Sequence, residues 1–260
     1  MSAGILDRIV AARRRRYGVT GEGGSGPPPG VGAPLAAATN AFLAALEAAR
    51  PRALIAEVKL ASPRLGTIPC RRSPERQAEA YARGGAAALS VVVEPEFFGG
   101  SWELLARCAG ASGLPTLAKD FVVHPRQLDE AREAGASAML LVAALHGASE
   151  LAAWAAAARA RGLAPLVETH EAADVARLEG GAWEMVGVNQ RDLRTFEVDR
   201  GRGSALAPFL PAAALRIAES GIASAADVER LAAEGFEAFL VGESLLLAED
   251  PVALLRELRG

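Results

Sequence analysis

The stretch "ALIAEVKLASP", residues 53–63, reads as a buried strand that ends in charge. Its first four residues are apolar. Glu57 and Lys59 follow two residues apart, so in a strand they point to the same side. A charged pair on one face of a core strand costs free energy unless it is paired or used. The stretch therefore predicts a core strand whose C-terminal end opens on a charged site.

The same unit repeats along the chain: a short apolar stretch, a polar loop, then in most cases a helix rich in Ala, Glu and Arg. The strands are predicted over 53–59, 87–93, 115–119, 138–143, 164–168, 185–189, 215–219 and 238–242. Nearly continuous apolar strands that alternate with helices indicate a parallel sheet covered by helices. Eight such units predict an α/β fold, a closed (β/α)8 or TIM barrel. No GxGxxG follows the first strand, which argues against a dinucleotide-binding fold.

The first 52 residues differ from the repeat and predict an N-terminal helical extension, with the barrel catalytic domain over 53–260 and a single domain overall. A helix is expected over 3–17 and a second over about 34–49. Between them, "GVTGEGGSGPPPGVG" (18–32) is rich in Gly and Pro and predicts a linker.

Composition excludes several classes of partner. The net charge is −3, so no basic field draws the chain to nucleic acid or to anionic lipid. The best apolar run, 138–145, has the length of a strand rather than of a membrane span. Cys70 and Cys108 cannot build a disulfide framework, which favours a cytoplasmic location. An apolar helix stripe serves a core and an interface alike, so we expect a monomer or a weak homodimer.

Chemistry in this architecture occurs at the C-terminal ends of the strands. Groups that could do chemistry lie at or just after the ends of seven of the eight predicted strands: Glu57, Lys59, Ser62; Glu94; Lys119, Asp120; Glu168, His170; Asn189, Arg191, Asp192; Glu219, Ser220; Gly242, Glu243, Ser244. One Lys–Glu pair fits a structural network as well as a functional one, but so many charges at one face favour a functional site. Glycine-bearing turns after the last two strands, 218–224 and 241–247, predict a phosphorylated small-molecule substrate held by backbone N–H groups.

Seven motifs resemble, in order, those of the indole-3-glycerol phosphate synthase family. They are "IAEVKLASPRLG", "EPEFFGGS", "LAKDFVVHPRQLDEAREAGASAMLLV", "LVETH", "GVNQRDLRTFEVD", "AESGI" and "FLVGESLL", over about residues 53–258. The resemblance implies conversion of 1-(2-carboxyphenylamino)-1-deoxyribulose 5-phosphate into indole-3-glycerol phosphate, CO2 and water, in tryptophan biosynthesis. It also implies no metal and no organic cofactor. His124, His146 and His170 are scattered, and they show no metal-ligand spacing with the two cysteines.

The resemblance also implies roles for individual residues. Lys119 would be the general acid of ring closure, and Glu168 the general base. Further catalytic groups would be Glu57, Lys59, Asn189 and Ser220; substrate contacts Ser62, Phe98, Phe121, Leu140, Arg191 and Glu219; and phosphate contacts Lys59, Gly221, Gly242 and Glu243. Asp120 and Asp192 are expected to anchor loops, and His170 to face away from the reacting centre.

Three motifs depart from the family pattern, two of them at Val93 and at Gln190, and two other functions compete with it. Many members have "SPSKG" where this chain has "SPRLG", with Arg64 and Leu65. Phosphoribosylanthranilate isomerase is the nearest enzyme alternative, but its chemistry would want a Cys/Asp pair at the strand ends. A barrel that binds a metabolite without turnover would predict loss of Lys119 or Glu168, and both are present.

Overall fold

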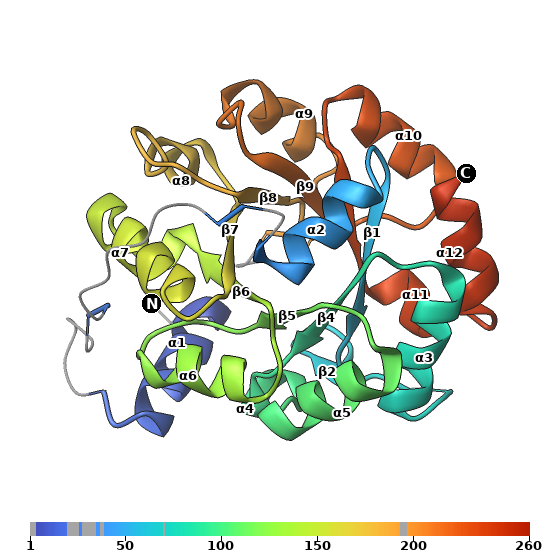
Figure 1. Ribbon diagram of the computed structural model, residues 1–260, viewed down its shortest axis with the longest axis horizontal. Coiled ribbons are helices and arrows are strands. Elements are labelled where there is room, and N and C mark those ends of the chain that lie inside the picture. The colour runs from blue at the N-terminus through green and yellow to red at the C-terminus, as the bar shows by residue number, and fades with distance from the viewer. Residues whose placement is uncertain (1–3, 20–25, 28–34, 37–38, 70, 193–196) are drawn as a thin grey trace.

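Eight parallel strands close into a barrel in the computed structural model, which describes residues 4–19, 26–27, 35–36, 39–69, 71–192 and 197–260 (Figure 1). The strands are β1 (Ala53–Val58), β4 (Ala88–Val92), β5 (Thr116–Lys119), β6 (Ala138–Val142), β7 (Ala164–Thr169), β8 (Met185–Asn189), β9 (Leu215–Glu219) and β10 (Ala238–Val241). Each pairs with its neighbours in chain order, and β1 closes the ring by pairing with both β4 and β10. The predicted barrel is confirmed, as is each of the eight strands.

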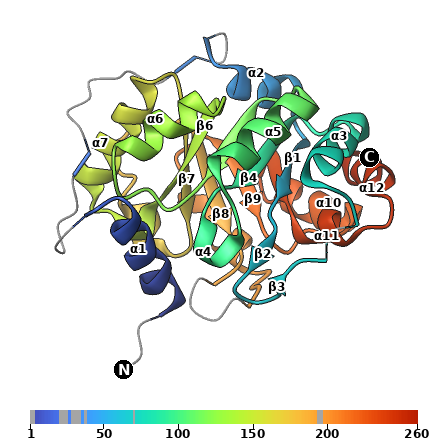
Figure 2. The ribbon, with the colours of Figure 1, turned by 90° about the horizontal axis from the view of Figure 1, so that it is seen from below.

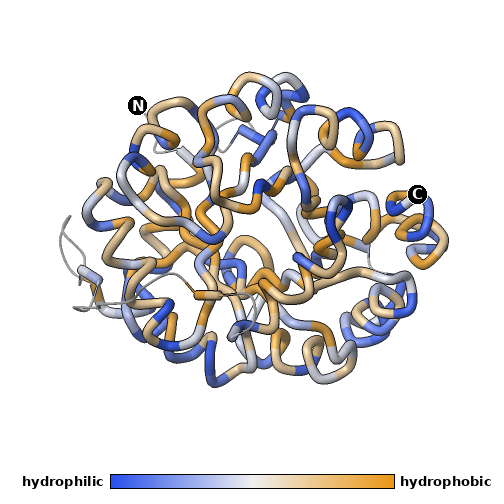
Figure 3. The backbone as a smooth tube through the Cα atoms, turned by 45° about the horizontal axis from the view of Figure 1, so that its top comes forward, coloured by the Kyte–Doolittle hydropathy of each residue, from blue (hydrophilic) through white to orange (hydrophobic). Residues whose placement is uncertain are grey.

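Helices surround the strands on the outside. The longer ones are α3 (Pro74–Gly84), α5 (Trp102–Ser112), α6 (Arg126–Glu133), α7 (Ala148–Arg159), α10 (Ala225–Ala233) and α12 (Pro251–Arg259). The shorter ones are α4 (Pro95–Phe98), α8 (Ala172–Ala176), α9 (Arg202–Leu206), α11 (Glu243–Leu247) and the 3-10 turns η2 (Ala143–Leu145) and η3 (Ala207–Phe209). A small hairpin, β2 (Ala61–Ser62) and β3 (Gly66–Thr67), follows β1. In Figure 3 the outer helices alternate between hydrophilic and hydrophobic residues, as expected of helices packed on one side.

Helix α2 (Ala41–Ala48) packs against the N-terminal end of the barrel. Its Phe42 and Leu46 are fully buried among the first inward-facing residues of the strands. The helix begins only after Asn40, whose side chain accepts hydrogen bonds from the N–H groups of Phe42 and Leu43. The predicted start near residue 34 was therefore wrong. The expected linker over 18–32 lies largely outside the described residues.

Helix α1 (Ile5–Arg16) lies at the opposite end, beside α4 (Figure 2). Arg13 is its anchor: the guanidinium is buried and forms an ion pair with Asp120, directly after β5. Asp120 also accepts hydrogen bonds from Gln127 and from its neighbour's backbone N–H. The expectation that Asp120 anchors a loop is confirmed, and the helix shares that anchor.

Candidate active site

The alternation of side chains along each strand builds the site. Inward-facing residues are apolar at the start of a strand and polar at its end. Three such inner pairs are Ile55 and Glu57, Leu117 and Lys119, and Leu166 and Glu168. Because all eight strands are parallel, these polar ends meet at one mouth of the barrel.

A pocket of about 620 Å³ occupies this mouth. It brings together thirteen of the predicted site residues: Glu57, Lys59, Phe98, Lys119, Phe121, Leu140, Glu168, Asn189, Arg191, Ser220, Gly221, Gly242 and Glu243. Two others lie off its surface. Glu219 is fully buried beneath it, and Ser62 sits in the hairpin, where its hydroxyl accepts a hydrogen bond from the N–H of Leu65.

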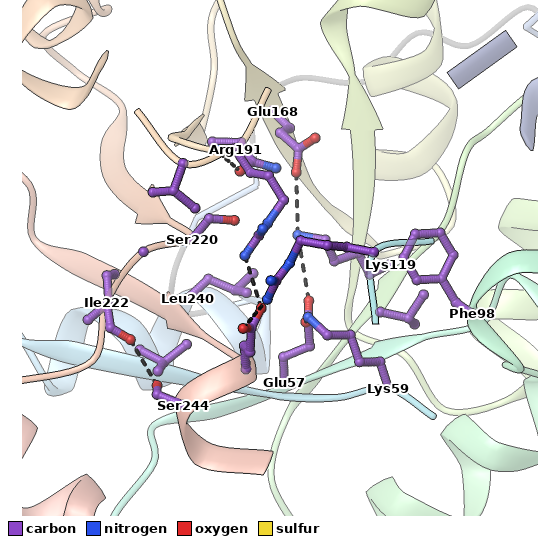
Figure 4. A pocket seen from close by; sticks show the side chains of 18 of the residues that line it. Glu57, Lys59, Phe98, Lys119, Glu168, Arg191, Ser220, Ile222, Leu240 and Ser244 are labelled. Carbon is purple, nitrogen blue, oxygen red and sulfur yellow. Dashed lines mark hydrogen bonds and ion pairs between the residues drawn. The ribbon is translucent and has the colours of Figure 1, made fainter. Parts of the chain in front are cut away.

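The Lys119 ammonium lies at the centre, among three carboxyl groups, of which Figure 4 shows those of Glu57 and Glu168. Its Nζ is 2.7 Å from Glu219 Oε2, 3.3 Å from Glu168 Oε2 and 3.7 Å from Glu57 Oε2. Burial disfavours the ammonium charge, but the three carboxylates outweigh it and raise the pKa of Lys119 above its ordinary value. Lys119 is therefore protonated at neutral pH and carries a proton that it can donate.

The carboxylates of Glu168 and Glu219 respond differently to the shared ammonium. Burial opposes ionisation of both. Lys119 and His170 outweigh burial at Glu168 and lower the pKa of that carboxyl. At Glu219, burial and the charge of Glu168 prevail over Lys119 and raise the pKa to about 8. Two neighbouring acids with pKa values driven apart are the arrangement expected where one group accepts a proton and another holds one.

Two glycines make room for these carboxylates. A Cβ on Gly187 of β8 would collide with Glu219 Oε1, and a Cβ on Gly242 would collide with Glu57 Oε1. Glu57 is held by Lys59, whose Nζ lies 2.6 Å from Oε1. Burial opposes its charge, but Lys59 and Lys119 together lower the pKa of the Glu57 carboxyl.

The loops after β9 and β10 face each other across one side of the pocket. Ser244 Oγ donates to the carbonyl of Ile222 at 2.8 Å and joins the two loops. Ser220 has φ +65°, the one positive value at a non-glycine residue within the described part of the chain, and Gly221 follows at +73°. Gln190 donates to the Ser220 carbonyl at 2.7 Å and supports this turn. A side chain held in the left-handed region is characteristic of functional sites.

A second cluster of charge lies at the rim. Glu243, the first residue of α11, forms ion pairs with Arg64 and, at 3.1 Å, with Arg191. Asn189 Oδ1 accepts from the Arg191 backbone N–H and fixes the start of that loop. Arg64 was noted in the sequence only as a departure from the family motif. The structure places it in the pocket wall, bridging the hairpin and α11.

An aromatic wall closes another side. The rings of Phe98 and Phe121 stack with centroids 6.2 Å apart. Phe98 is positioned by Glu94, a fully buried carboxylate that accepts hydrogen bonds from three backbone N–H groups at the start of α4. A four-residue helix is too short to show a periodic pattern, but the acidic residue before Pro95 is a recognisable N-cap.

His170 lies directly after β7 and is buried, with Nε2 3.2 Å from Glu168 Oε1. It does not line the pocket, so its contact with the site runs through the Glu168 carboxylate.

Two properties of the described part of the chain concern membranes and metals. No helix within it is both long and apolar enough to cross a membrane. Across the same residues, no cluster of three or more His, Cys, Asp or Glu side chains is arranged to hold a metal ion.

Comparisons with known proteins bear on the fold and on the family of the chain. Solved structures show the same fold at low identity: the 3-hexulose-6-phosphate synthase from Salmonella typhimurium has a TM-score of 0.61 at 14% identity, covering 80% of this chain and 96% of that one. The indole-3-glycerol phosphate synthase of Variovorax paradoxus (strain S110) is 39% identical over 254 residues, covering 95% of this chain and 96% of that protein. That of Mycobacterium leprae (strain Br4923) is 43% identical over 227 residues, covering 86% and 83%.

The family itself is matched over most of the chain. A sequence model described as indole-3-glycerol phosphate synthase matches residues 31–258, which span the second N-terminal helix and the whole barrel. The match includes every strand end that contributes to the pocket. The chain therefore belongs to the indole-3-glycerol phosphate synthase family.

Proposed function

We propose that this chain makes indole-3-glycerol phosphate from 1-(2-carboxyphenylamino)-1-deoxyribulose 5-phosphate, with Lys119 as general acid and Glu168 as general base. One observation carries the assignment of the two residues. The ammonium of Lys119 and the carboxylate of Glu168 lie 3.3 Å apart in one pocket, so an acid and a base reach the same substrate atoms.

The first step closes the ring. The aromatic carbon that bears the carboxylate attacks C2 of the ribulose, and the carbonyl oxygen takes a proton from Lys119. Formation of the C–C bond makes the carbon that bears the carboxylate tetrahedral, so the ring loses its aromaticity. CO2 then leaves, and its bonding electrons restore the aromatic ring. The neighbouring carboxylates Glu57 and Glu168 favour the charged form of Lys119 before the proton moves.

The second step removes water. Glu168 takes a proton from the methylene that was C1 of the ribulose, while the hydroxyl on C2 departs with a proton supplied by an acid. The lowered pKa of Glu168 keeps it ionised and ready to accept. Asn189 and Ser220 would orient the substrate between these groups.

The two ends of the substrate would be held by opposite parts of the pocket. The phosphate would lie against Lys59 and the backbone of Gly221, Gly242 and Glu243, where the loops after β9 and β10 converge. The planar guanidinium of Arg191 suits the anthranilate carboxylate. The stacked rings of Phe98 and Phe121 offer an apolar surface to the aromatic ring. Leu140, Ser62 and the buried Glu219 would complete the substrate contacts.

The test is turnover by chelator-treated protein, followed by the fluorescence of the indole product. Lys119→Ala and Glu168→Gln are each expected to lower kcat by about 10²–10⁴-fold, the range for loss of a positioned acid or base. Arg161→Gln serves as the control, because it removes a charge paired with Asp129 outside the pocket and should retain activity. Turnover that survives Lys119→Ala would refute the general acid and direct attention to Lys59. A folded wild type without turnover would refute the function.

A further inference from the structure

We infer that His170 is a positioning residue that orients the Glu168 carboxylate and balances its charge from behind the pocket wall. The inference rests on the proposed role of Glu168 as the base, and it concerns a group outside the pocket lining. His170 is 9% exposed and does not line the pocket, so it acts on the substrate only through Glu168.

The two oxygens of Glu168 face two different cations. Oε2 lies 3.3 Å from Lys119 Nζ, and Oε1 lies 3.2 Å from His170 Nε2. A carboxylate with one oxygen directed to each side has its plane fixed. The oxygen beside Lys119 is thereby presented to the pocket.

His170 is itself held by Asp174. Nδ1 of the ring lies 3.8 Å from Asp174 Oδ2, and the same oxygen accepts the backbone N–H of His170 at 2.8 Å. Asp174 is fully buried and forms an ion pair with Arg177 through its other oxygen. The chain of contacts from α8 to the pocket is thus Asp174, His170, Glu168 and Lys119.

A carboxylate at each ring nitrogen favours the doubly protonated imidazolium. Burial alone lowers the pKa of His170, but Asp174 and Glu168 outweigh it and raise the pKa to about 9. The other charged groups around this pair are Arg177, directly after α8, which pairs with Asp174, and Lys119 on β5 and Glu219 on β9, which lie beside Glu168. At neutral pH the ring is a cation, and it favours the ionised form of Glu168.

The first experiment reads the ring directly, without activity. The chain has three histidines, so ring signals in an NMR titration of histidine-labelled protein are assigned by comparison with His170→Gln. The His170 midpoint is expected near 9 in the wild type. It should fall by about one pH unit or more in Glu168→Gln, where the partner charge is lost. An unchanged midpoint would overturn the inference.

The second experiment reads catalysis. Glutamine at position 170 keeps a donor but removes the charge, so the pKa of Glu168 rises and the acid limb of the kcat–pH profile moves to higher pH. The midpoint of the acid limb of the kcat–pH profile is expected to rise by about one pH unit in His170→Gln, which is a loss of up to about tenfold in kcat at a fixed pH on that limb and no change on the plateau above it. His146→Gln is the matched control, a buried histidine that pairs with Glu150 and does not contact Glu168.

The outcomes separate the two proposals. A loss of kcat in His170→Gln that is equal at every pH would overturn the positioning role while leaving the function intact. A wild type without turnover would refute the proposed function, whereas the NMR titration would still decide whether His170 and Glu168 are coupled.

Discussion

Lys119 and Asp120 are adjacent charges at the end of β5, the first partly exposed and the second buried, and they belong to different kinds of ion cluster. Asp120 pairs with one arginine, Arg13, and its remaining hydrogen bonds are satisfied by Gln127 and a backbone N–H. Lys119 faces three carboxylates, and one of these, Glu219, has an oxygen with no hydrogen-bond partner. The first cluster balances its charges and fastens a helix. In the second, three carboxyls share one ammonium, their pKa values are driven apart, and a proton can move among them.

The largest expected effect on stability comes from the balanced pair. Arg13→Met leaves Asp120 buried without its cation and should lower the free energy of unfolding by about 3–5 kcal/mol. Lys119→Met should cost less stability, because the carboxylates around it border the pocket and can take up protons. Urea unfolding of both variants measures the difference.

A double variant sharpens this comparison. Arg13→Met combined with Asp120→Leu replaces the pair by apolar side chains and should recover most of the loss, as such replacements often do. A stability of Arg13→Met within about 1 kcal/mol of the wild type would show that the pair does not fasten α1.

A smaller effect on stability concerns the cluster around Lys119 and depends on pH. The folded-state pKa of Glu219 is raised to about 8, above its value in an unfolded chain. Its contribution to stability is therefore fully present below about pH 4.5 and is lost as pH rises toward 8. Glu219→Gln removes this loss. The Tm of the variant minus the Tm of the wild type should therefore be larger at pH 8 than at pH 5, by at least about 2 °C. A Tm difference between the two proteins that does not depend on pH would contradict the raised pKa of Glu219.

The smallest expected effect on stability is at Ser220. Ser220→Gly relieves a left-handed backbone that costs a non-glycine residue roughly 1–2 kcal/mol, but glycine also gains freedom in the unfolded chain. The two terms nearly cancel, so the free energy of unfolding should change by less than about 1 kcal/mol, while kcat falls with loss of the hydroxyl. A variant with unchanged kcat would show that the turn matters and the side chain does not.

The barrel was predictable from the sequence because its strands are buried on both faces. Each strand is a nearly continuous apolar run, and no boundary differs from the prediction by more than one residue. The convergence of Glu57, Lys119 and Glu168 followed from parallel strands, which direct all their C-terminal ends to one mouth.

The rest depends on contacts that no local pattern specifies. Arg13 and Asp120 are 107 residues apart in sequence. The space that Glu219 and Glu57 occupy is left by Gly187 on β8 and by Gly242, directly after β10. The Arg64 bridge to Glu243 likewise joins two loops that are distant in sequence, and only the folded chain brings them together.

The pairing of β1 with β10, which closes the barrel, has a consequence for folding while the chain is being synthesised. Ala53 and Ala238 are partners in register, so β1 emerges long before the strand that completes its second edge. Until then one side of β1 presents unpaired N–H and C=O groups, an edge able to pair with another chain. The guanidinium of Arg13 likewise lacks its ion-pair partner until Asp120 has been synthesised. The growing chain is thus most exposed to misassociation just before its last strand is made, and chaperone capture during translation should be greatest there.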